Sequence, residues 1–156
     1  MRLTFRLATE SDYRQLENLM IASFEPITWF RRADAIFGPL NGKDWRERWR
    51  LRLAGVFRTQ TVLAGEAAGE IVAVATGTID AAAKLGYIDI LAVDRRHQGK
   101  GYGREMLRGM LEHMKQQGAE HAHLDCLTNN DAGNRLYESE GFTEVARHIR
   151  WFKRIG

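Results

Sequence analysis

The sequence predicts an α+β fold in which a mixed, mostly antiparallel sheet is flanked by helices. Two observations lead to this fold class. Strand-like stretches rich in Val, Ile and Ala follow one another over residues 61–93, and helical patterns lie before and after them. The steady alternation of strand and helix that builds a doubly wound parallel sheet does not occur. The chain has 156 residues, 44% of them hydrophobic, which suits one packed core, so we expect residues 1–156 to form a single domain.

The first part of the chain is expected to hold one strand and two helices. Residues 2–8 alternate apolar and polar side chains with the period of a half-buried strand. Thr9 followed by Asp12 resembles a helix start, with a carboxylate near the positive end of the helix dipole. A second helix is expected over about residues 43–56, where we interpret a cluster of arginines as its solvated face. Residues 27–42 mix aromatic and charged side chains with turn signals and predict no clear element.

The second part is expected to hold the rest of the sheet and two further helices. Ala68 and Gly69 favour a hairpin between two strands. Gly118 and Gly141 each follow a helical pattern, and glycine is a natural helix end because it adopts the left-handed conformation. In chain order, we expect strands at 61–64, 71–79 and 87–93, a helix at 101–117, a strand at 121–126, a helix at 130–139, and two short closing strands between 142 and 153.

Composition narrows the classes of function. The first ten residues carry spread charges and no continuous apolar run, so they do not resemble a signal peptide, and no stretch approaches the length that spans a bilayer. The only cysteine, Cys126, excludes an internal disulfide framework. A net charge of +3 suits an anionic ligand and falls short of a nucleic-acid-binding signature. We therefore expect a cytoplasmic protein with no membrane or nucleic-acid partner.

The most informative stretch is residues 98–103 (QGKGYG), here called the glycine turn. It lies between a strand that ends near Val93 and a helix that begins near Gly101. Glycines let a backbone approach a ligand closely, because no Cβ atoms intervene. The N–H groups of the first helical turn are unpaired and lie at the positive end of the helix dipole. This geometry favours a phosphate or pyrophosphate.

The glycine turn has three other interpretations. A Walker A loop is excluded, because its Gly-Lys-Ser/Thr order is absent. A dinucleotide-binding fingerprint fits Gly99 and Gly101 but places Arg104 where the third glycine belongs, and the turn comes two-thirds along the chain instead of in an opening strand–helix–strand unit. Asp125 nevertheless lies at the distance expected of a ribose-binding acid, so this interpretation stays open. A structural turn without a ligand also stays open.

The remaining pattern, Q/R-x-x-G-x-G/A, is matched by Gln98, Gly101 and Gly103. Here the sequence resembles the GNAT N-acetyltransferase superfamily, whose acyl-CoA-binding motif this is. The likeness extends to residues 91–93 (LAV) and to residues 130–142, which match the family's N-x-x-A/G-x-x-L-Y-E-x-x-G-F run. It is specific over about residues 85–145 and general before that. Arg95 stands where the family commonly has a proline, which affects the stiffness of the turn.

The resemblance implies a GNAT-like fold and the transfer of an acetyl group from acetyl-CoA to a primary amine of a small molecule or protein, by direct attack in a ternary complex and without a metal. Strand residues would bind the pantetheine arm through their backbone, and the glycine turn would bind the pyrophosphate. A homodimer is common in the family. The coenzyme-binding residues implied are Leu91, Ala92, Val93, Gln98, Gly99, Lys100, Gly101, Tyr102, Gly103 and Asn130.

Amine acetylation needs a base for the ammonium, whose pKa is about 10, and an acid for the departing thiolate, whose conjugate pKa is about 8.5. The resemblance assigns Tyr137 as the acid; the alternative is a packed core tyrosine. Asp89 is the candidate base, acting through water, because strand alternation places it on one face with Tyr87, Leu91 and Val93. The alternative for Asp89 is an ion pair with one of the many arginines. Asn130 has a second possible role as a helix N-cap.

Two further features complete the expectations. His121, His123 and Asp125 have a metal-like spacing on one strand face, but the opposite face is the apolar one, so we interpret them as solvated and expect no metal site. Aromatic residues between positions 24 and 37 lie where this fold binds its acceptor, which the sequence does not identify. A non-catalytic acyl-CoA-binding or sensor domain is the alternative function; the presence of Tyr137 and Asp89 favours the enzyme.

Overall fold

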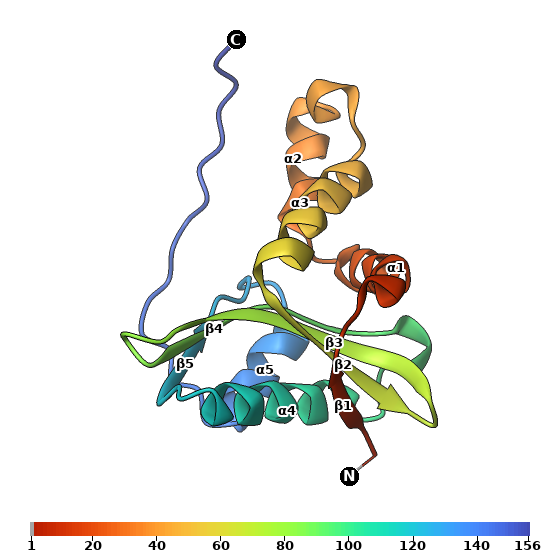
Figure 1. The fold of residues 1–156 in the computed structure, drawn as a ribbon. Helices are drawn as coiled ribbons and strands as arrows, with labels where there is room; N and C mark the ends of the chain where they lie inside the picture. Colours follow the sequence, from red (N-terminus) through yellow and green to blue (C-terminus); the bar gives the residue numbers. More distant parts are fainter. Residues whose placement is uncertain (1) are drawn as a thin grey trace.

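A computed structural model describes residues 2–156 as a five-stranded sheet with helices on both faces (Figure 1). The strands are ordered along the sheet as they are along the chain. The first four pair antiparallel, and the fifth pairs parallel with the fourth. The predicted mixed, mostly antiparallel sheet is therefore confirmed. The strands are β1 (Thr4–Leu7), β2 (Thr61–Ala67), β3 (Glu70–Asp80), β4 (Leu85–Val93) and β5 (His121–Leu124).

The helices divide between the two faces of the sheet (Figure 1). On one face, α1 and α3 enclose a core that contains Met20, Trp49 and Leu53. On the other face, α4 encloses a second core with Met106 and Met110. No helix within residues 2–156 is long and apolar enough to cross a membrane. The helices are α1 (Tyr13–Phe24), α2 (Trp29–Phe37), α3 (Trp45–Thr59), α4 (Tyr102–Gln116) and α5 (Asp131–Ser139), with short 3-10 turns at Glu10–Asp12, Leu40–Gly42 and Arg95–His97.

The start of α1 forms as the sequence predicts. Thr9 and Asp12 form a capping box: the Thr9 N–H donates to the Asp12 carboxylate at 2.8 Å, and a 3-10 turn leads into the helix. Arg6 of β1 donates two hydrogen bonds to the same carboxylate, at 2.7 and 3.0 Å. Asp12 therefore fastens the first helix to the first strand. Residues 27–42, which predicted no clear element, contain α2.

A β-bulge interrupts the pairing of β3 with β4. Thr76 pairs with Ile90, and the following residue, Gly77, pairs with Ile88, so Asp89 is the extra residue on β4. A bulge of this kind bends the strand and shifts the alternation of its side chains between the two faces. Gly77 fits the site because an added Cβ would lie 2.2 Å from the Tyr87 carbonyl oxygen.

The bulge corrects one prediction. Asp89 contacts Arg52 of α3, on the first face of the sheet, whereas Leu91 and Val93 pack against the core under α4. The expectation that Tyr87, Asp89, Leu91 and Val93 share one face is therefore wrong. Strict alternation holds only in an uninterrupted ladder, and the extra residue, Asp89, shifts the alternation so that Leu91 and Val93 lie on the other face.

The predicted strands between 142 and 153 are also wrong. Residues 143–156, here called the C-terminal segment, form no helix or strand, and Figure 1 shows them extending away from the sheet. An extended segment becomes a strand only when a neighbour pairs with its N–H and C=O groups. Within residues 2–156, no backbone hydrogen bond reaches the C-terminal segment.

Candidate active site

β4 and β5 separate halfway along β4, which leaves β4 with a free edge at residues 89–93. The two strands pair only where residues 85–88 lie beside residues 121–124. The N–H of Asp94 donates to the Val72 carbonyl at 2.8 Å. By the alternation of an antiparallel ladder, Leu91 and Val93 therefore direct their N–H and C=O groups away from β3, toward the free edge. An extended ligand can pair with these groups as a further strand does.

Gln98 connects the glycine turn to this edge. Its side-chain Nε2 donates to the Val93 carbonyl at 3.2 Å. One acceptor of the free edge is thus already used, and the N–H of Val93 and both backbone groups of Leu91 remain for a ligand. Gln98 was predicted to donate its own N–H to a pyrophosphate; the structure adds a role for its side chain, which fixes where the turn begins.

The glycine turn closes with left-handed residues. Gly99 and Gly101 have φ of +81° and +83°, a region that glycine enters without strain. Gly101 is also the N-cap position of α4, and no side chain caps this helix. Glycine at the cap leaves the N–H groups of the first turn, which begins at Tyr102, facing outward at the positive end of the helix dipole. Outward-facing N–H groups at the positive end of a helix are suited to an anion.

Arg2 adds a positive charge that sequence reasoning missed. Its guanidinium donates to the Lys100 carbonyl, lies 4.9 Å from the ring centre of Tyr102, and comes within 3.1 Å of the Glu105 carboxylate. A Cβ added at Gly101 would lie 3.0 Å from Arg2 Nη2, so the turn is tightly enclosed on this side. Nothing in the sequence pattern connects Arg2 with a turn almost a hundred residues away.

α5 carries Asn130 and Tyr137 and packs against the start of α4. A Cβ at Gly103 would lie 3.8 Å from Leu136 of α5, an ordinary contact distance. Asn130 caps α5, its Oδ1 accepting from the Gly133 N–H at 3.1 Å. A Cβ at Gly133 would lie 2.6 Å from Asn130 Nδ2, so the cap needs glycine there. The N-cap role of Asn130 is therefore observed, and a coenzyme contact through its Nδ2 stays a prediction.

Tyr137 is largely enclosed by apolar side chains. It packs against the same core as Leu91 and Val93, and its ring meets Phe142 edge to face at 5.8 Å. Burial, with a smaller contribution from nearby Cys126, raises the pKa of the Tyr137 hydroxyl. The phenol therefore stays protonated at neutral pH, as a proton donor must.

Two side chains donate hydrogen bonds to the Asp89 carboxylate. One belongs to α3 and the other to Gln60, the residue that follows α3. Arg52 Nη2 and Gln60 Nε2 donate to its two oxygens at 2.7 and 2.8 Å. The ion pair that the sequence analysis gave as the alternative for Asp89 is thus present. The prediction that the arginine cluster on α3 is a solvated face holds only in part. Arg46 and Arg50 have side chains that are 42 and 48% exposed, whereas Arg48 makes a similar pair with Asp34 and is 14% exposed.

His121, His123 and Asp125 were predicted to form a solvated strand face. Within residues 2–156, no group of three or more His, Cys, Asp or Glu side chains is arranged to hold a metal ion. The His123 ring lies 4.9 Å from the Tyr87 ring, and Asp125 accepts from the Tyr87 hydroxyl at 3.4 Å and lies 3.3 Å from His148. Burial raises the pKa of the Cys126 thiol, so this cysteine favours its neutral form.

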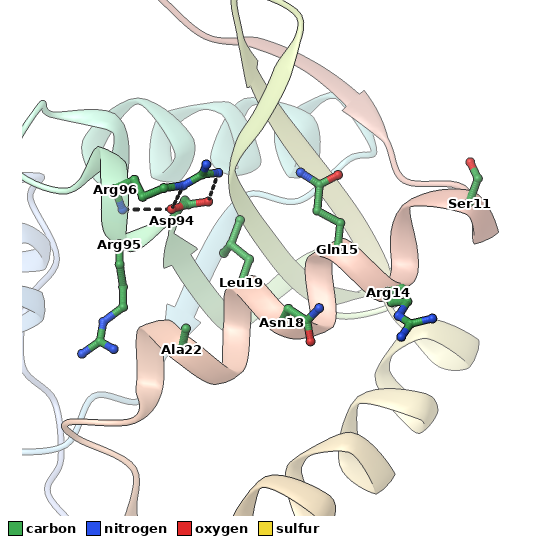
Figure 2. A pocket seen from close by; sticks show the side chains of 9 residues that line it. All are labelled: Ser11, Arg14, Gln15, Asn18, Leu19, Ala22, Asp94, Arg95 and Arg96. Atoms are coloured by element: carbon green, nitrogen blue, oxygen red, sulfur yellow. Dashed lines mark hydrogen bonds and ion pairs between the residues drawn. The ribbon is translucent and has the colours of Figure 1, made fainter.

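A hollow of about 560 Å³ lies between α1 and the segment that joins β4 to the glycine turn (Figure 2). Arg14 and Asn18 of α1 line one side, and Arg95 and Arg96 line the other. Arg96 pairs with Asp94 at 3.0 Å (Figure 2). Sequence reasoning did not predict this hollow; the adjacent arginines were its only signal. It lies beside residues 94–96, just before the turn, so it borders the candidate site without containing it.

The model of the acetyltransferase (GNAT) family matches residues 21–142. The chain belongs to this family. A Bacillus subtilis protein described as uncharacterized N-acetyltransferase YobR is 32% identical over 80 residues, 51% of this chain and 32% of that protein. The N-alpha-acetyltransferase RimI of Mycobacterium tuberculosis is 35% identical over 69 residues, 44% of this chain and 42% of that protein. The chain thus matches less than half of each relative's length.

Solved structures show the same GNAT fold over nearly the whole chain. The aminoglycoside acetyltransferase AAC(6')-Iy, in complex with a CoA-containing bisubstrate analogue, superposes with a TM-score of 0.69 at 12% identity, covering 99% of this chain and 100% of that one. In this GNAT chain, then, the fold brings together the free edge of β4, the glycine turn and α5 with Tyr137. Asp89 lies on the opposite face of the sheet from Leu91 and Val93.

Proposed function

We propose that this chain is an N-acetyltransferase that moves an acetyl group from acetyl-CoA to a primary amine, with residues 1–156 acting as one catalytic domain. The observation that carries the proposal is the meeting of two unpaired backbone surfaces. The free edge of β4 ends at Val93, and Gln98 links it directly to the uncapped start of α4. An extended amide-bearing arm joined to a pyrophosphate, as in coenzyme A, is complementary to both surfaces at once.

Each predicted coenzyme contact has a distinct role in this proposal. Leu91 and Val93 offer backbone groups to the pantetheine amides, whereas Ala92 pairs with Val74 of β3 and sets their spacing. Residues 99–103 donate N–H groups to the pyrophosphate. Lys100, with its Nζ 3.4 Å from His97 Nδ1, adds positive charge beside the turn, as does Arg2.

Acetyl transfer then proceeds in a ternary complex. The neutral amine attacks the thioester carbonyl, the tetrahedral intermediate collapses, and the carbon–sulfur bond breaks. Tyr137 donates its hydroxyl proton to the departing thiolate, which becomes the free thiol of CoA. The proton lost by the amine passes through water to Asp89, whose carboxylate Arg52 and Gln60 hold in place.

The acceptor amine belongs to a small molecule or a protein. One relative is named an N-alpha-acetyltransferase, and the AAC(6')-Iy complex holds a bisubstrate analogue built on neamine. Both of these acceptors are amines, which supports the reaction class. α1 and α2 lie where the family resemblance places the acceptor, so we expect them to contribute to acceptor specificity.

One observation favours an alternative, a non-catalytic acyl-CoA-binding or sensor domain. Both oxygens of Asp89 already accept hydrogen bonds from Arg52 and Gln60, which is the arrangement expected of a carboxylate with a purely structural role. The same fold and coenzyme contacts serve either function, so binding alone does not distinguish them.

A two-stage experiment tests both functions. Thermal shift with acetyl-CoA, longer acyl-CoAs and CoA measures binding, because a ligand that binds only the folded state raises Tm. Release of free thiol is then followed with a panel of amines, including peptides with free N-termini and polyamines. Binding with turnover on an amine supports the enzyme, binding without turnover on any amine supports the sensor, and the absence of binding contradicts both.

A further inference from the structure

The hollow beside α1 is lined by an excess of positive charge (Figure 2). Its volume of about 560 Å³ lies within the range of about 300–1,000 Å³ that is typical of small-molecule sites. Three arginines line it, Arg14, Arg95 and Arg96, together with a single carboxylate, Asp94. A hollow lined mostly by one sign of charge concentrates the electrostatic potential inside it. The hollow therefore favours an anionic ligand.

The charge of Arg14 is not compensated within the described chain. Within residues 2–156, no carboxylate forms an ion pair with this exposed side chain. Glu17 would be a natural partner, because residues three apart on a helix are neighbours. Glu17 instead pairs with Arg50 of α3 at 3.3 Å. The guanidinium of Arg14 therefore keeps its N–H donors for a ligand.

The two arginines on the opposite wall differ in how completely they are paired. Arg96 donates to both oxygens of Asp94, at 3.2 and 3.0 Å, and so forms a complete pair. Arg95 Nη1 lies 3.4 Å from one oxygen of Glu25, but the other oxygen of Glu25 accepts from Arg46 Nη2 at 2.6 Å. One carboxylate thus serves two arginines. Arg95 is therefore the second guanidinium of the hollow that can bind a further anion.

These two arginines lie at opposite ends of the hollow. Arg14 lies near the start of α1, whereas Arg95 lies beside Ala22, near the end of the same helix (Figure 2). Arg14 and Ala22 are eight residues apart, so about 12 Å separate them along the helix axis. Between them, the hollow is lined by the apolar side chain of Leu19 and the amide of Asn18. A ligand that contacts both arginines must carry an anionic group at each end.

We propose that the hollow binds a small molecule with two separated anionic groups, either a dicarboxylate or a phosphate ester that also carries a carboxylate. Arg14 binds one group and Arg95 the other, because a guanidinium matches two oxygens of a carboxylate or phosphate at once. The long arginine side chains cover part of the distance between them, so a short ligand suffices. Its aliphatic middle rests on Leu19, and the Asn18 amide hydrogen-bonds to any hydroxyl group that it carries.

This site is separate from the one proposed for the coenzyme. The hollow is bordered by α1, which covers the first face of the sheet, whereas α4, whose start would bind the pyrophosphate, covers the second face. The residues that line the hollow end at Arg96, before the glycine turn begins at Gln98. Both sites can therefore be occupied at the same time. The inference does not depend on the proposed acetyl transfer.

Calorimetry with two dianionic probes tests the site. Glutarate represents the dicarboxylates, and 3-phosphoglycerate represents the phosphate esters that carry a carboxylate; the tighter binder identifies the class. We expect the better probe to bind with the same affinity in the presence of saturating CoA, which would occupy the glycine turn. Pentanoate, which has the carbon chain of glutarate and a single carboxylate, should bind about tenfold more weakly than glutarate, the loss expected for one charged hydrogen-bonding partner.

Two variants remove the site in different ways. Arg14→Gln removes one cationic end and should weaken binding of the better probe about tenfold. Ala22→Leu leaves every charge in place, fills part of the hollow and should weaken binding to at least the same extent. Arg58→Gln is the matched control, because Arg58 is an exposed arginine at the end of α3 that does not line the hollow, and its affinity should equal that of the wild-type chain.

Four results would overturn the proposal. Binding of neither dianion would show that the hollow holds no such ligand. Pentanoate that binds as tightly as glutarate would reduce the site to a contact with one surface arginine. Wild-type affinity in Arg14→Gln or Ala22→Leu would place the probe outside the hollow, and binding that CoA abolishes would place it in the glycine turn. Circular dichroism of each variant confirms that it folds, which is expected because Arg14 is exposed and leucine is a good helix former.

Discussion

Arg52 and Asp89 form an ion pair, with 2.7 Å between Arg52 Nη2 and Asp89 Oδ1, that joins α3 to the bulge of β4. The Arg52 guanidinium also lies 5.0 Å from the ring centre of Trp49, so the pair rests against the first core. The bulge turns this carboxylate to the opposite face of the sheet from Leu91 and Val93. The candidate proton acceptor therefore lies on one face of the sheet, while the backbone groups proposed to bind the coenzyme lie at the sheet edge two to four residues farther along β4.

We expect a substitution at Asp89 to lower turnover without weakening the binding of CoA. Asp89→Asn should lower kcat by about 10²-fold or more if the carboxylate accepts the amine proton, as general-base losses usually do. The dissociation constant for CoA should not change, because Asp89 does not face the free edge of β4. Thiol-release kinetics and a CoA titration check both parts. An unchanged kcat would assign Asp89 a structural role only.

We expect a branched side chain at Gly101 to weaken the binding of the coenzyme. Gly101→Val places a branched side chain at φ +83° at the start of α4, beside the N–H groups proposed to bind the pyrophosphate. We expect the dissociation constant for CoA to rise at least tenfold, measured by calorimetry. Gly69→Val is the control, with φ +80° in the β2–β3 hairpin, where it brings similar backbone strain. If both variants bind CoA equally well, the pyrophosphate site lies elsewhere.

We expect removal of the Tyr137 hydroxyl to lower turnover and to leave the packing of the ring unchanged. Tyr137→Phe keeps the ring against Phe142 and removes only the hydroxyl. If that hydroxyl protonates the thiolate, kcat should fall by about 10²–10⁴-fold while the affinity for CoA changes little. Pre-steady-state thiol release separates this loss from slow product release. Wild-type turnover in Tyr137→Phe would leave the tyrosine as a packed core residue.

Local sequence patterns predicted the parts of the site that depend on short segments. The glycine turn needs glycine where φ is positive, and α5 needs Asn130 as its cap, so both follow from residues within one turn of each other. The register of a strand, in contrast, is set by its neighbour. The bulge at Asp89 exists only in the pairing of β3 with β4, and no period within β4 alone reveals it.

The other features that the sequence did not predict also depend on residues that are far apart in the chain. Arg2 reaches the glycine turn and Arg52 reaches Asp89 across the fold, so their partners follow from topology instead of sequence spacing. The C-terminal segment has a strand-like alternation, but its residues lack a ladder within one chain. The pattern there correctly indicates an extended backbone, and within the described residues no strand lies beside it to complete a ladder.

Asp12 predicts how stability depends on pH. Hydrogen bonds from Arg6, and then the backbone N–H of Thr9, hold the pKa of the Asp12 carboxyl well below its ordinary value near 3.8. The folded state therefore favours the ionised carboxylate. Its contribution to the free energy of unfolding is complete above about pH 5 and falls as the pH drops through and below 3.8.

Asp12→Asn isolates this contribution, because asparagine keeps the helix-capping ability and loses the charge. We expect the variant to be less stable than the wild-type chain by about 1 kcal/mol at pH 7, the scale of a partly exposed charged hydrogen bond. The difference should shrink as the pH falls below 3.8, because the Asp12 carboxyl group of the unfolded wild-type chain then binds a proton that the folded state excludes. Urea unfolding at a series of pH values measures both curves. Curves that stay parallel down to pH 2 would show that the charge of Asp12 does not couple the first strand to α1.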